Sequence, residues 1–259
     1  MPVADPARED APSPTIPHRA LPAYYGNSLE ERRHFVRHIF DDTAADYDRI
    51  ESLLALGSGR RYRRQALLRA GLAEGMHVVD VGCGTGLVAR EALAIVGARG
   101  SLIGVDPSPG MIGQAHLAAA TLLEGRAEAL PCPAASADFL AMGYALRHLD
   151  DLDAAFAEFA RVLRPGGRLL VLEITAPQSR LGRGVLKTYM RTVVPTLARL
   201  VSRQAHTREL WRYYWDTIEA CIAPSAVLAA LQRAGFVDVR RCVELGIFSE
   251  YTARSPWQA

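Results

Sequence analysis

The stretch 78-VVDVGCGTGLVAR-90 decides the fold. An apolar run is followed by glycines at Gly82, Gly84 and Gly86, and then by residues with a helical pattern. Glycine-rich turns between a strand and a helix bind dinucleotides in some proteins and other nucleotide-like cofactors in others. The stretch therefore predicts a cofactor site at the carboxyl end of a strand in an α/β protein.

Short apolar segments alternate with amphipathic segments on both sides of this stretch. We expect strands at 77–82, 101–106, 121–125, 137–144 and 168–174, helices at 86–96, 109–119 and 151–163, and a turn at 164–167. A helix from Pro224 and two strands within 237–254 close the chain. This alternation predicts a Rossmann-like sheet of seven mostly parallel strands with helices on both faces.

The chain divides into five predicted parts. They are a disordered, proline-rich tail at 1–26, N-terminal helices at 27–72 that cover the site, a cofactor-binding core at 73–174, a helical lid at 175–224, and a closing helix with strands at 225–259. Ser28 and Glu31 have the spacing of a capping box at the start of the first helix. The lid is predicted because fifty residues far exceed an ordinary connection of about 2–6 residues.

Composition excludes several classes of protein. A net charge of +2 does not favour nucleic acid as a partner. The four cysteines are scattered without a CxxC pair, which favours free thiols in a cytoplasmic protein over a disulfide framework or a metal site. We expect neither a signal peptide nor a membrane span, because the first residues do not show the basic–apolar–small pattern and no apolar run approaches the ~20 residues that span a bilayer.

The glycine spacing separates two cofactor classes. A dinucleotide-binding turn has the pattern G-x-G-x-x-G, whereas this chain has G-x-G-x-G and Leu87 in place of the last glycine. The next predicted strand ends in Asp106, and an acid at that position accepts hydrogen bonds from a ribose diol. The loop with this acid resembles the cofactor motifs of class I S-adenosylmethionine-dependent methyltransferases.

Four further motifs extend the resemblance. They are FDDTAADYD (40–48), AEALPCP (127–133), LRHLDD (146–151) and RVLRPGGRLLVLE (161–173). Together they resemble the ubiquinone/menaquinone biosynthesis C-methyltransferase family, over roughly residues 35–175. The resemblance implies a methyltransferase with S-adenosylmethionine as cofactor. It places the cofactor against Asp80, Gly82, Gly84, Thr85, Gly86, Asp106, Pro107, Met111, Arg126, Ala127 and Gly143.

This chain departs from the family pattern at four positions. His148 stands where the family usually has Asn, Arg126 where an Asn or Asp meets the adenine, Glu51 in place of Asn, and Tyr62 in place of Trp. Arg126 cannot accept a hydrogen bond, so we expect the adenine contacts to fall to the neighbouring backbone and Ala127. These changes leave the cofactor assignment intact and weaken the assignment of the substrate.

Three residues are candidates for catalysis. His148 follows the fourth predicted strand and is a candidate general base. The alternative role is to begin the next helix together with the aspartates after it. Arg147 is a candidate for stabilising a phenolate or carboxylate. Tyr47 is placed near the cofactor and the substrate by the resemblance.

The predicted lid and the end of the tail supply candidate substrate contacts. Trp211, Tyr214, Trp215 and Ile218 form one apolar stripe of a helix, which packs in a core or lines a pocket for an aromatic or lipid-like substrate. Tyr24 and Tyr25 are predicted to dock on the body. Arginines around the lid favour an anionic substrate or peripheral contact with an acidic membrane surface, and a homodimer is open.

Three functions remain open from the sequence. The leading one is C-methylation of a small hydrophobic molecule such as a quinone precursor. The second is O- or N-methylation of another small aromatic or carboxylic metabolite. The third is a protein that binds the cofactor without catalysis as an assembly partner, for which Arg126 is the main support.

Overall fold

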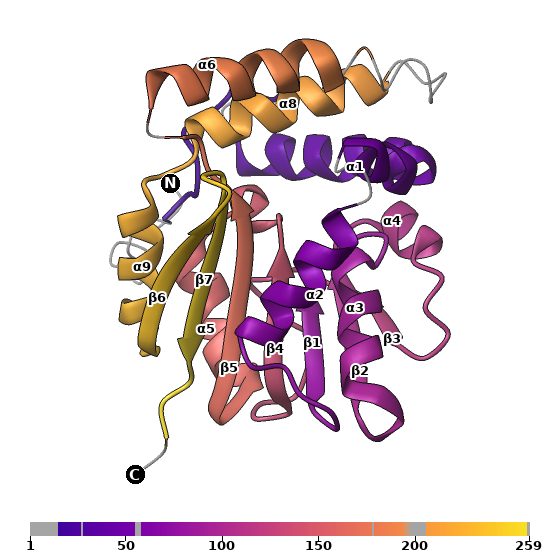
Figure 1. Ribbon diagram of the computed structural model, residues 1–259, viewed down its shortest axis with the longest axis vertical. Helices are drawn as coiled ribbons and strands as arrows, with labels where there is room; N and C mark the ends of the chain where they lie inside the picture. Colours follow the sequence, from indigo (N-terminus) through magenta and orange to yellow (C-terminus); the bar gives the residue numbers. More distant parts are fainter. Residues whose placement is uncertain are drawn as a thin grey trace, which may run out of the picture.

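The computed structural model describes residues 15–26, 28–54, 58–177, 179–194, 196 and 206–257. A central sheet carries helices on both faces, and three more helices lie across one end of it (Figure 1). The strands are β1 (His77–Val81), β2 (Ser101–Asp106), β3 (Thr121–Glu124), β4 (Ala137–Gly143), β5 (Leu163–Ile174), β6 (Val237–Glu244) and β7 (Phe248–Arg254). Their order in the sheet is β3-β2-β1-β4-β5-β7-β6.

The sheet is parallel from β3 to β5 and antiparallel only at β7, which pairs with both β5 and β6. The predicted seven-stranded, mostly parallel Rossmann-like sheet is therefore confirmed. The predicted turn at 164–167 lies inside β5 instead. Ala137 pairs with Leu163, and Phe139 pairs with Arg168. Residues 164–167 therefore bulge from the ladder, and Gly166 among them adopts a φ of +76°.

Helices cover the two faces of the sheet as separate hydrophobic layers. The helices that pack on it are α2 (Gly59–Arg69), α3 (Leu87–Val96), α5 (Leu152–Val162) and α9 (Pro224–Arg233). The α2 and α3 side chains pack with Val78, Leu102 and Phe139, and those of α5 and α9 pack with Val79 and Leu140. Successive strand residues point to opposite faces, so both faces of β1 are buried.

The third layer lies across the carboxyl ends of the strands. It contains α1 (Leu29–Leu54), α6 (Arg180–Thr188) with the π-turn η4 (Tyr189–Val193), and α8 (His206–Ala220). In Figure 1, α8 lies between α1 and α6, above the sheet. Trp211, Tyr214, Trp215 and Ile218 are all buried in the cluster that joins these helices, so the predicted apolar stripe is a packing surface.

Three short elements complete the described part of the chain. They are the helix α4 (Pro109–Gln114) and the 3-10 turns η2 (Gly97–Arg99) and η3 (Leu146–His148). The predicted helix at 109–119 thus ends five residues early, at Gln114. No helix in the described ranges is long and apolar enough to cross a membrane.

The N-terminal boundary differs from the prediction. Residues 15–26, predicted as part of a disordered tail, run across the body: the Leu152 N–H donates to the Thr15 carbonyl, and the Ile222 N–H donates to the Pro17 carbonyl. Residues 1–14 lie outside the described residues. The capping box is confirmed, because the Ser28 and Glu31 N–H groups donate to each other's side chains at 3.3 and 3.0 Å.

Candidate active site

The glycine loop between β1 and α3 needs residues without a side chain. Gly82, Gly84 and Gly86 have φ values of +66°, +53° and +85°, which L-residues rarely adopt. A Cβ on Gly82 would lie 2.6 Å from the Ala145 Cβ, and one on Gly86 would lie 2.6 Å from the Leu117 side chain. A Cβ on Gly84 would meet only the Met111 methyl group, at 3.6 Å, so the loop leaves room beside Gly84.

Asp106 joins the tip of β2 to this loop. Its carboxylate accepts from the Gly84 N–H at 2.8 Å and the Ser108 N–H at 2.9 Å, and burial raises its pKa to about 6. Asp80 lies beneath the loop, fully buried, where desolvation and the Asp106 charge raise its pKa to about 8. Asp106 therefore faces the cavity, while Asp80 supports the loop from behind.

A cavity of about 730 Å³ opens at the carboxyl ends of the strands beneath α1 and α8. This volume falls in the range of small-molecule sites, about 300–1,000 Å³. Twelve of the predicted site residues line it: Tyr47, Gly82, Gly84, Thr85, Asp106, Pro107, Met111, Arg126, Ala127, Gly143, His148 and Tyr214. The volume, the room at Gly84 and the acid at Asp106 fit a nucleoside cofactor with an amino-acid tail.

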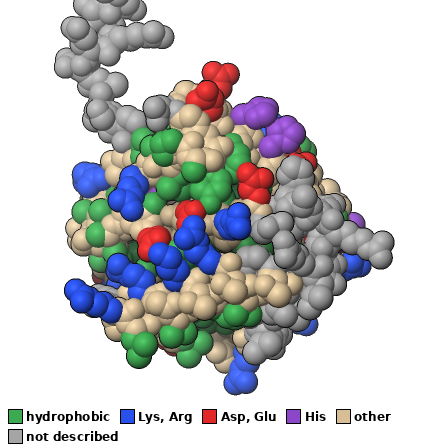
Figure 2. Space-filling view, turned by 90° about the horizontal axis from the view of Figure 1, so that it is seen from above, with side chains coloured by type: hydrophobic (Ala, Val, Ile, Leu, Met, Phe, Trp, Pro, Cys, Tyr) green, Lys and Arg blue, Asp and Glu red, His purple; other side chains and the backbone are tan. Residues whose placement is uncertain are grey.

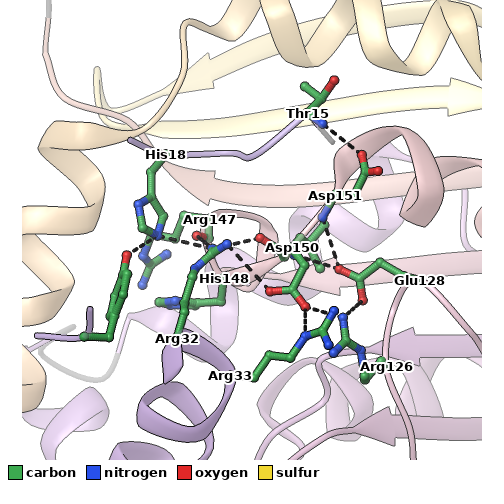
Figure 3. A network of polar contacts seen from close by, with 12 residues as sticks. Thr15, His18, Arg32, Arg33, Arg126, Glu128, Arg147, His148, Asp150 and Asp151 are labelled. Atoms are coloured by element: carbon green, nitrogen blue, oxygen red, sulfur yellow. Dashed lines mark hydrogen bonds and ion pairs between the residues drawn. The ribbon is translucent and has the colours of Figure 1, made fainter. Parts of the chain in front are cut away.

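Arg126 contributes to a network of charges at one end of the cavity (Figure 3). It pairs with Glu128 at 3.2 Å and with Asp150, and Arg33 also reaches Asp150, at 2.6 Å. Glu128 in turn accepts the Asp150 N–H at 2.7 Å. Arg126 is thereby held by carboxylates, and the hydrogen-bond acceptors that face this end of the cavity come from Glu128 and Asp150.

Arg32 and His18 extend the network under the N-terminal segment (Figure 3). Arg32 donates to the Leu149 carbonyl at 2.7 Å and lies 3.3 Å from His18 Nε2, while His18 Nδ1 lies 2.7 Å from the Arg19 carbonyl. Burial and the neighbouring Arg32 lower the His18 pKa to about 4. His18 is therefore a neutral acceptor that fixes Arg32, and through it α1, over the site.

Tyrosines from α1 and α8 meet at the other end of the cavity. The Tyr47 and Tyr214 hydroxyl groups lie 2.6 Å apart, and Phe40 packs edge-on against Tyr214. Burial raises the pKa of Tyr47 well above 10. This end of the cavity is thus an apolar, aromatic chamber with a pair of coupled hydroxyl groups.

His148 lines the same chamber and stacks on Tyr213. Its Nδ1 lies 3.2 Å from the Tyr213 hydroxyl, and its Nε2 has no hydrogen-bond partner in the described part of the chain. Burial, and then the charge of Arg147, lower the His148 pKa well below 6.5. The imidazole is therefore neutral at neutral pH, with one ring nitrogen uncommitted.

Arg147 is fully buried and does not line the cavity. It pairs with Glu173 at 2.6 Å, donates to the Thr217 hydroxyl at 3.2 Å, and lies 4.2 Å from the centre of the Tyr214 ring. The role predicted for Arg147, electrostatic stabilisation of a phenolate or carboxylate, stays a prediction, because the side chain is buried outside the cavity lining. Its contacts make it a positioning residue that acts through Tyr214.

Five other predicted site residues lie outside the cavity lining. Gly86 packs on Leu117, and Tyr25, Trp211 and Trp215 belong to the hydrophobic cluster between α1 and α8. Tyr24 donates to Asp216 at 2.5 Å and packs on Phe35. Their cofactor and substrate contacts remain predictions, while their packing roles are evident.

Arg63 and Glu51 are candidate binding residues, although the sequence marked Glu51 only as a departure from the family pattern and did not single out Arg63. They pair at 2.6 Å between α2 and α1, and both line the cavity. Arg63 is buried, and its Nε has no partner in the described ranges. The chain spacing offers no signal for this pair, because only the packing of α1 on α2 brings them together.

The topology, the glycine loop and the acid after β2 define a class I S-adenosylmethionine-dependent methyltransferase. The chain belongs to the ubiE/COQ5 methyltransferase family, whose model matches residues 27–253. It is an enzyme of that class, with S-adenosylmethionine as its cofactor and a small-molecule methyl acceptor.

Curated relatives cover most of the chain. A demethylmenaquinone methyltransferase of Symbiobacterium thermophilum is 33% identical over 84% of this chain and 90% of its own length. The ubiquinone/menaquinone biosynthesis C-methyltransferase UbiE of Syntrophotalea carbinolica is 36% identical over 83% of this chain and 92% of its own.

Solved structures share the fold at lower identity. A SAM-dependent methyltransferase from Aquifex aeolicus superposes with a TM-score of 0.58 at 20% identity, over 80% of this chain and 97% of that chain. Phosphoethanolamine N-methyltransferase 2 of Haemonchus contortus, in complex with S-adenosyl-L-methionine, gives 0.55 at 16% identity, over 76% of this chain and 52% of its own.

Proposed function

We propose that the enzyme methylates a ring carbon of a hydrophobic, hydroxylated aromatic acceptor, such as a reduced quinone precursor, with His148 as the general base. The observation that carries the proposal is the neutral His148 imidazole, which lines the apolar chamber and whose Nε2 has no hydrogen-bond partner among the described residues. The relatives named for demethylmenaquinone and ubiquinone/menaquinone methylation support this class of acceptor.

The cofactor is assigned to the half of the cavity built by the glycine loop. Asp106 holds the ribose hydroxyls, and the backbone around Ala127 meets the adenine, with Glu128 and Asp150 as nearby acceptors. Arg63 and Glu51 suit the carboxylate and ammonium of the amino-acid tail, because each has the opposite charge. The bound cofactor supplies a methyl group activated on a sulfonium, so the protein supplies alignment and a base.

The acceptor is assigned to the chamber between Phe40, Tyr47, His148 and Tyr214. His148 Nε2 takes the proton of the acceptor hydroxyl, and the electron pair released into the ring makes the adjacent carbon nucleophilic. That carbon would form the new bond to the methyl group as the methyl–sulfur bond breaks and its electron pair passes to sulfur. The hydrogen of the carbon would then leave as a proton to solvent while His148 returns its proton to the acceptor oxygen, which restores the aromatic ring. The four side chains that define this chamber include no cation, because His148 is neutral, and this disfavours an anionic carboxylate acceptor.

The test uses a soluble short-chain demethylmenaquinol and benzoate as competing acceptor classes. We expect a product with a carbon-bound methyl group, identified by NMR, and a loss of about 10²–10⁴-fold in kcat for His148→Asn. His116→Asn, which changes an exposed histidine, serves as the matched control. An oxygen-bound methyl group, or full activity of His148→Asn, would refute the assignment.

The pH profile gives a second readout. A base with a pKa well below 6.5 is unprotonated at pH 6.5, so kcat/KM of the wild type should stay level from pH 8 to 6.5 and fall only at a pH well below 6.5. The fall should be absent from the residual activity of His148→Asn. Cofactor affinity, measured by calorimetry with S-adenosylhomocysteine, should be unchanged in this variant.

A further inference from the structure

Helix α6 presents an exposed hydrophobic strip. Leu181 is 80% exposed and Val185 is 63% exposed, and they lie one helical turn apart on the same face. The opposite side of the segment already packs on the helices beneath it, because Leu186 and Met190 belong to the hydrophobic cluster that contains residues of α1 and α8. The exposed strip therefore has no role in the packing of the described chain.

Basic side chains border this strip. The segment 180–193, RLGRGVLKTYMRTV, contains Arg180, Arg183, Lys187 and Arg191 and no acidic residue. Lys187 and Arg191 reach acids of α8 at 3.9 and 3.3 Å, whereas Arg180 and Arg183 make no ion pair with a described residue. The outer face of α6 thus carries positive charge that this part of the protein leaves unneutralised.

The position of α6 makes this face accessible. It is the outermost helix of the lid in Figure 1, and Figure 2 looks down on it from above. Figure 2 shows Lys and Arg side chains gathered across this face and hydrophobic side chains beside them. Beneath α6 lies α8, which contributes Tyr214 to the cavity.

We propose that α6 docks flat on an anionic lipid bilayer. Leu181 and Val185 enter the boundary between head groups and acyl chains, and Arg180, Arg183 and Lys187 contact the lipid phosphates, as in interfacial amphipathic helices. The lid is thereby held at a surface where hydrophobic acceptors are concentrated. Two aliphatic side chains are too few for a stable protein interface, which buries about 800 Å² per partner.

The docking does not depend on the identity of the acceptor, so it is tested by binding alone. Full-length protein is sedimented with phosphatidylcholine vesicles that contain or lack phosphatidylglycerol. We expect binding to the anionic vesicles only, weaker at high salt because the head-group charge is screened. Leu181→Gln/Val185→Gln and Arg180→Gln/Arg183→Gln should each lower the partition coefficient about tenfold.

Matched controls come from exposed positions on α2. Leu68→Gln removes an exposed aliphatic side chain, and Arg61→Gln/Arg64→Gln removes two exposed charges. Both should bind vesicles like the wild type, and all variants should keep their affinity for S-adenosylhomocysteine, which shows that they are folded. Failure of the wild type to bind anionic vesicles, or equal losses in the α2 variants, would overturn the proposal. So would a dimer, seen by light scattering, that Leu181→Gln/Val185→Gln dissociates without changing vesicle binding.

Discussion

The two halves of the cavity are built in different ways. The cofactor half is formed mainly by three turns that follow one another in the chain, namely the glycine loop, the turn after β2 and the turn after β3, with Glu51 and Arg63 added from α1 and α2. The acceptor half is formed by side chains of α1, η3 and α8, and its Tyr47–Tyr214 contact joins residues 167 positions apart. The first half is therefore fixed by local rules, and the second depends on the packing of the lid.

The buried ion pair between Arg147 and Glu173, which lies behind the acceptor half, gives the strongest test of this contrast. Arg147→Met removes the cation that pairs with Glu173, which is only 1% exposed, and this should cost about 3–5 kcal/mol of unfolding free energy. Arg147→Met/Glu173→Gln should recover most of that loss in urea denaturation. The double variant should bind S-adenosylhomocysteine normally yet turn over more slowly, because Tyr214 loses its cation partner. A weaker affinity of the double variant for S-adenosylhomocysteine would show that the cofactor half also depends on this ion pair.

Gly82→Ala should damage the cofactor half instead. The substitution strains a residue with positive φ by about 1–2 kcal/mol and forces the loop away from Ala145, so we expect roughly a hundredfold loss of affinity for S-adenosylhomocysteine. Gly113→Ala is the control, since its added Cβ meets nothing within 4 Å. Calorimetry measures the affinity of both variants for S-adenosylhomocysteine. Unchanged affinity in Gly82→Ala would mean that the loop only makes the turn.

The free energy of unfolding should depend on pH through His18, which fixes Arg32 of α1 over the site. Below pH 6.5 the unfolded chain binds a proton at His18 that the folded chain does not take up until about pH 4. Stability therefore falls as the pH drops from 6.5 to 4, by about 1.4 kcal/mol per pH unit, or about 2 kcal/mol between pH 6.5 and 5. His18→Gln should remove this part of the pH dependence in urea denaturation, and the exposed His116→Gln should retain it. Identical curves for wild type and His18→Gln would contradict the assignment.

The same contrast explains what the sequence predicts. Strands such as 101–106 and the loop 82–86 are predictable because their apolar runs and glycines encode local conformation, and the order of the parallel strands follows from their alternation with helices. The burial of Arg147 against Glu173 is not predictable, because a motif does not tell whether an arginine faces a ligand or a carboxylate. Residues 15–26 were misjudged for a similar reason, since proline content does not reveal the contacts that Thr15, Pro17 and His18 make with distant residues.

The smallest expected effect is at the pair of hydroxyl groups in the acceptor half. Tyr47→Phe and Tyr214→Phe each remove one partner of a 2.6 Å hydrogen bond, which is worth about 1 kcal/mol, so each should lower kcat about five- to tenfold with cofactor affinity unchanged. If the two hydroxyl groups position the acceptor as one unit, the double variant should be no slower than either single variant, because the second substitution has no bond left to break. Steady-state kinetics with the same acceptor give kcat for the wild type, the two single variants and the double variant, which together form a double-mutant cycle. Multiplicative losses would mean that each tyrosine contacts the acceptor by itself, and the acceptor half would then be a set of independent side chains and not one packed unit.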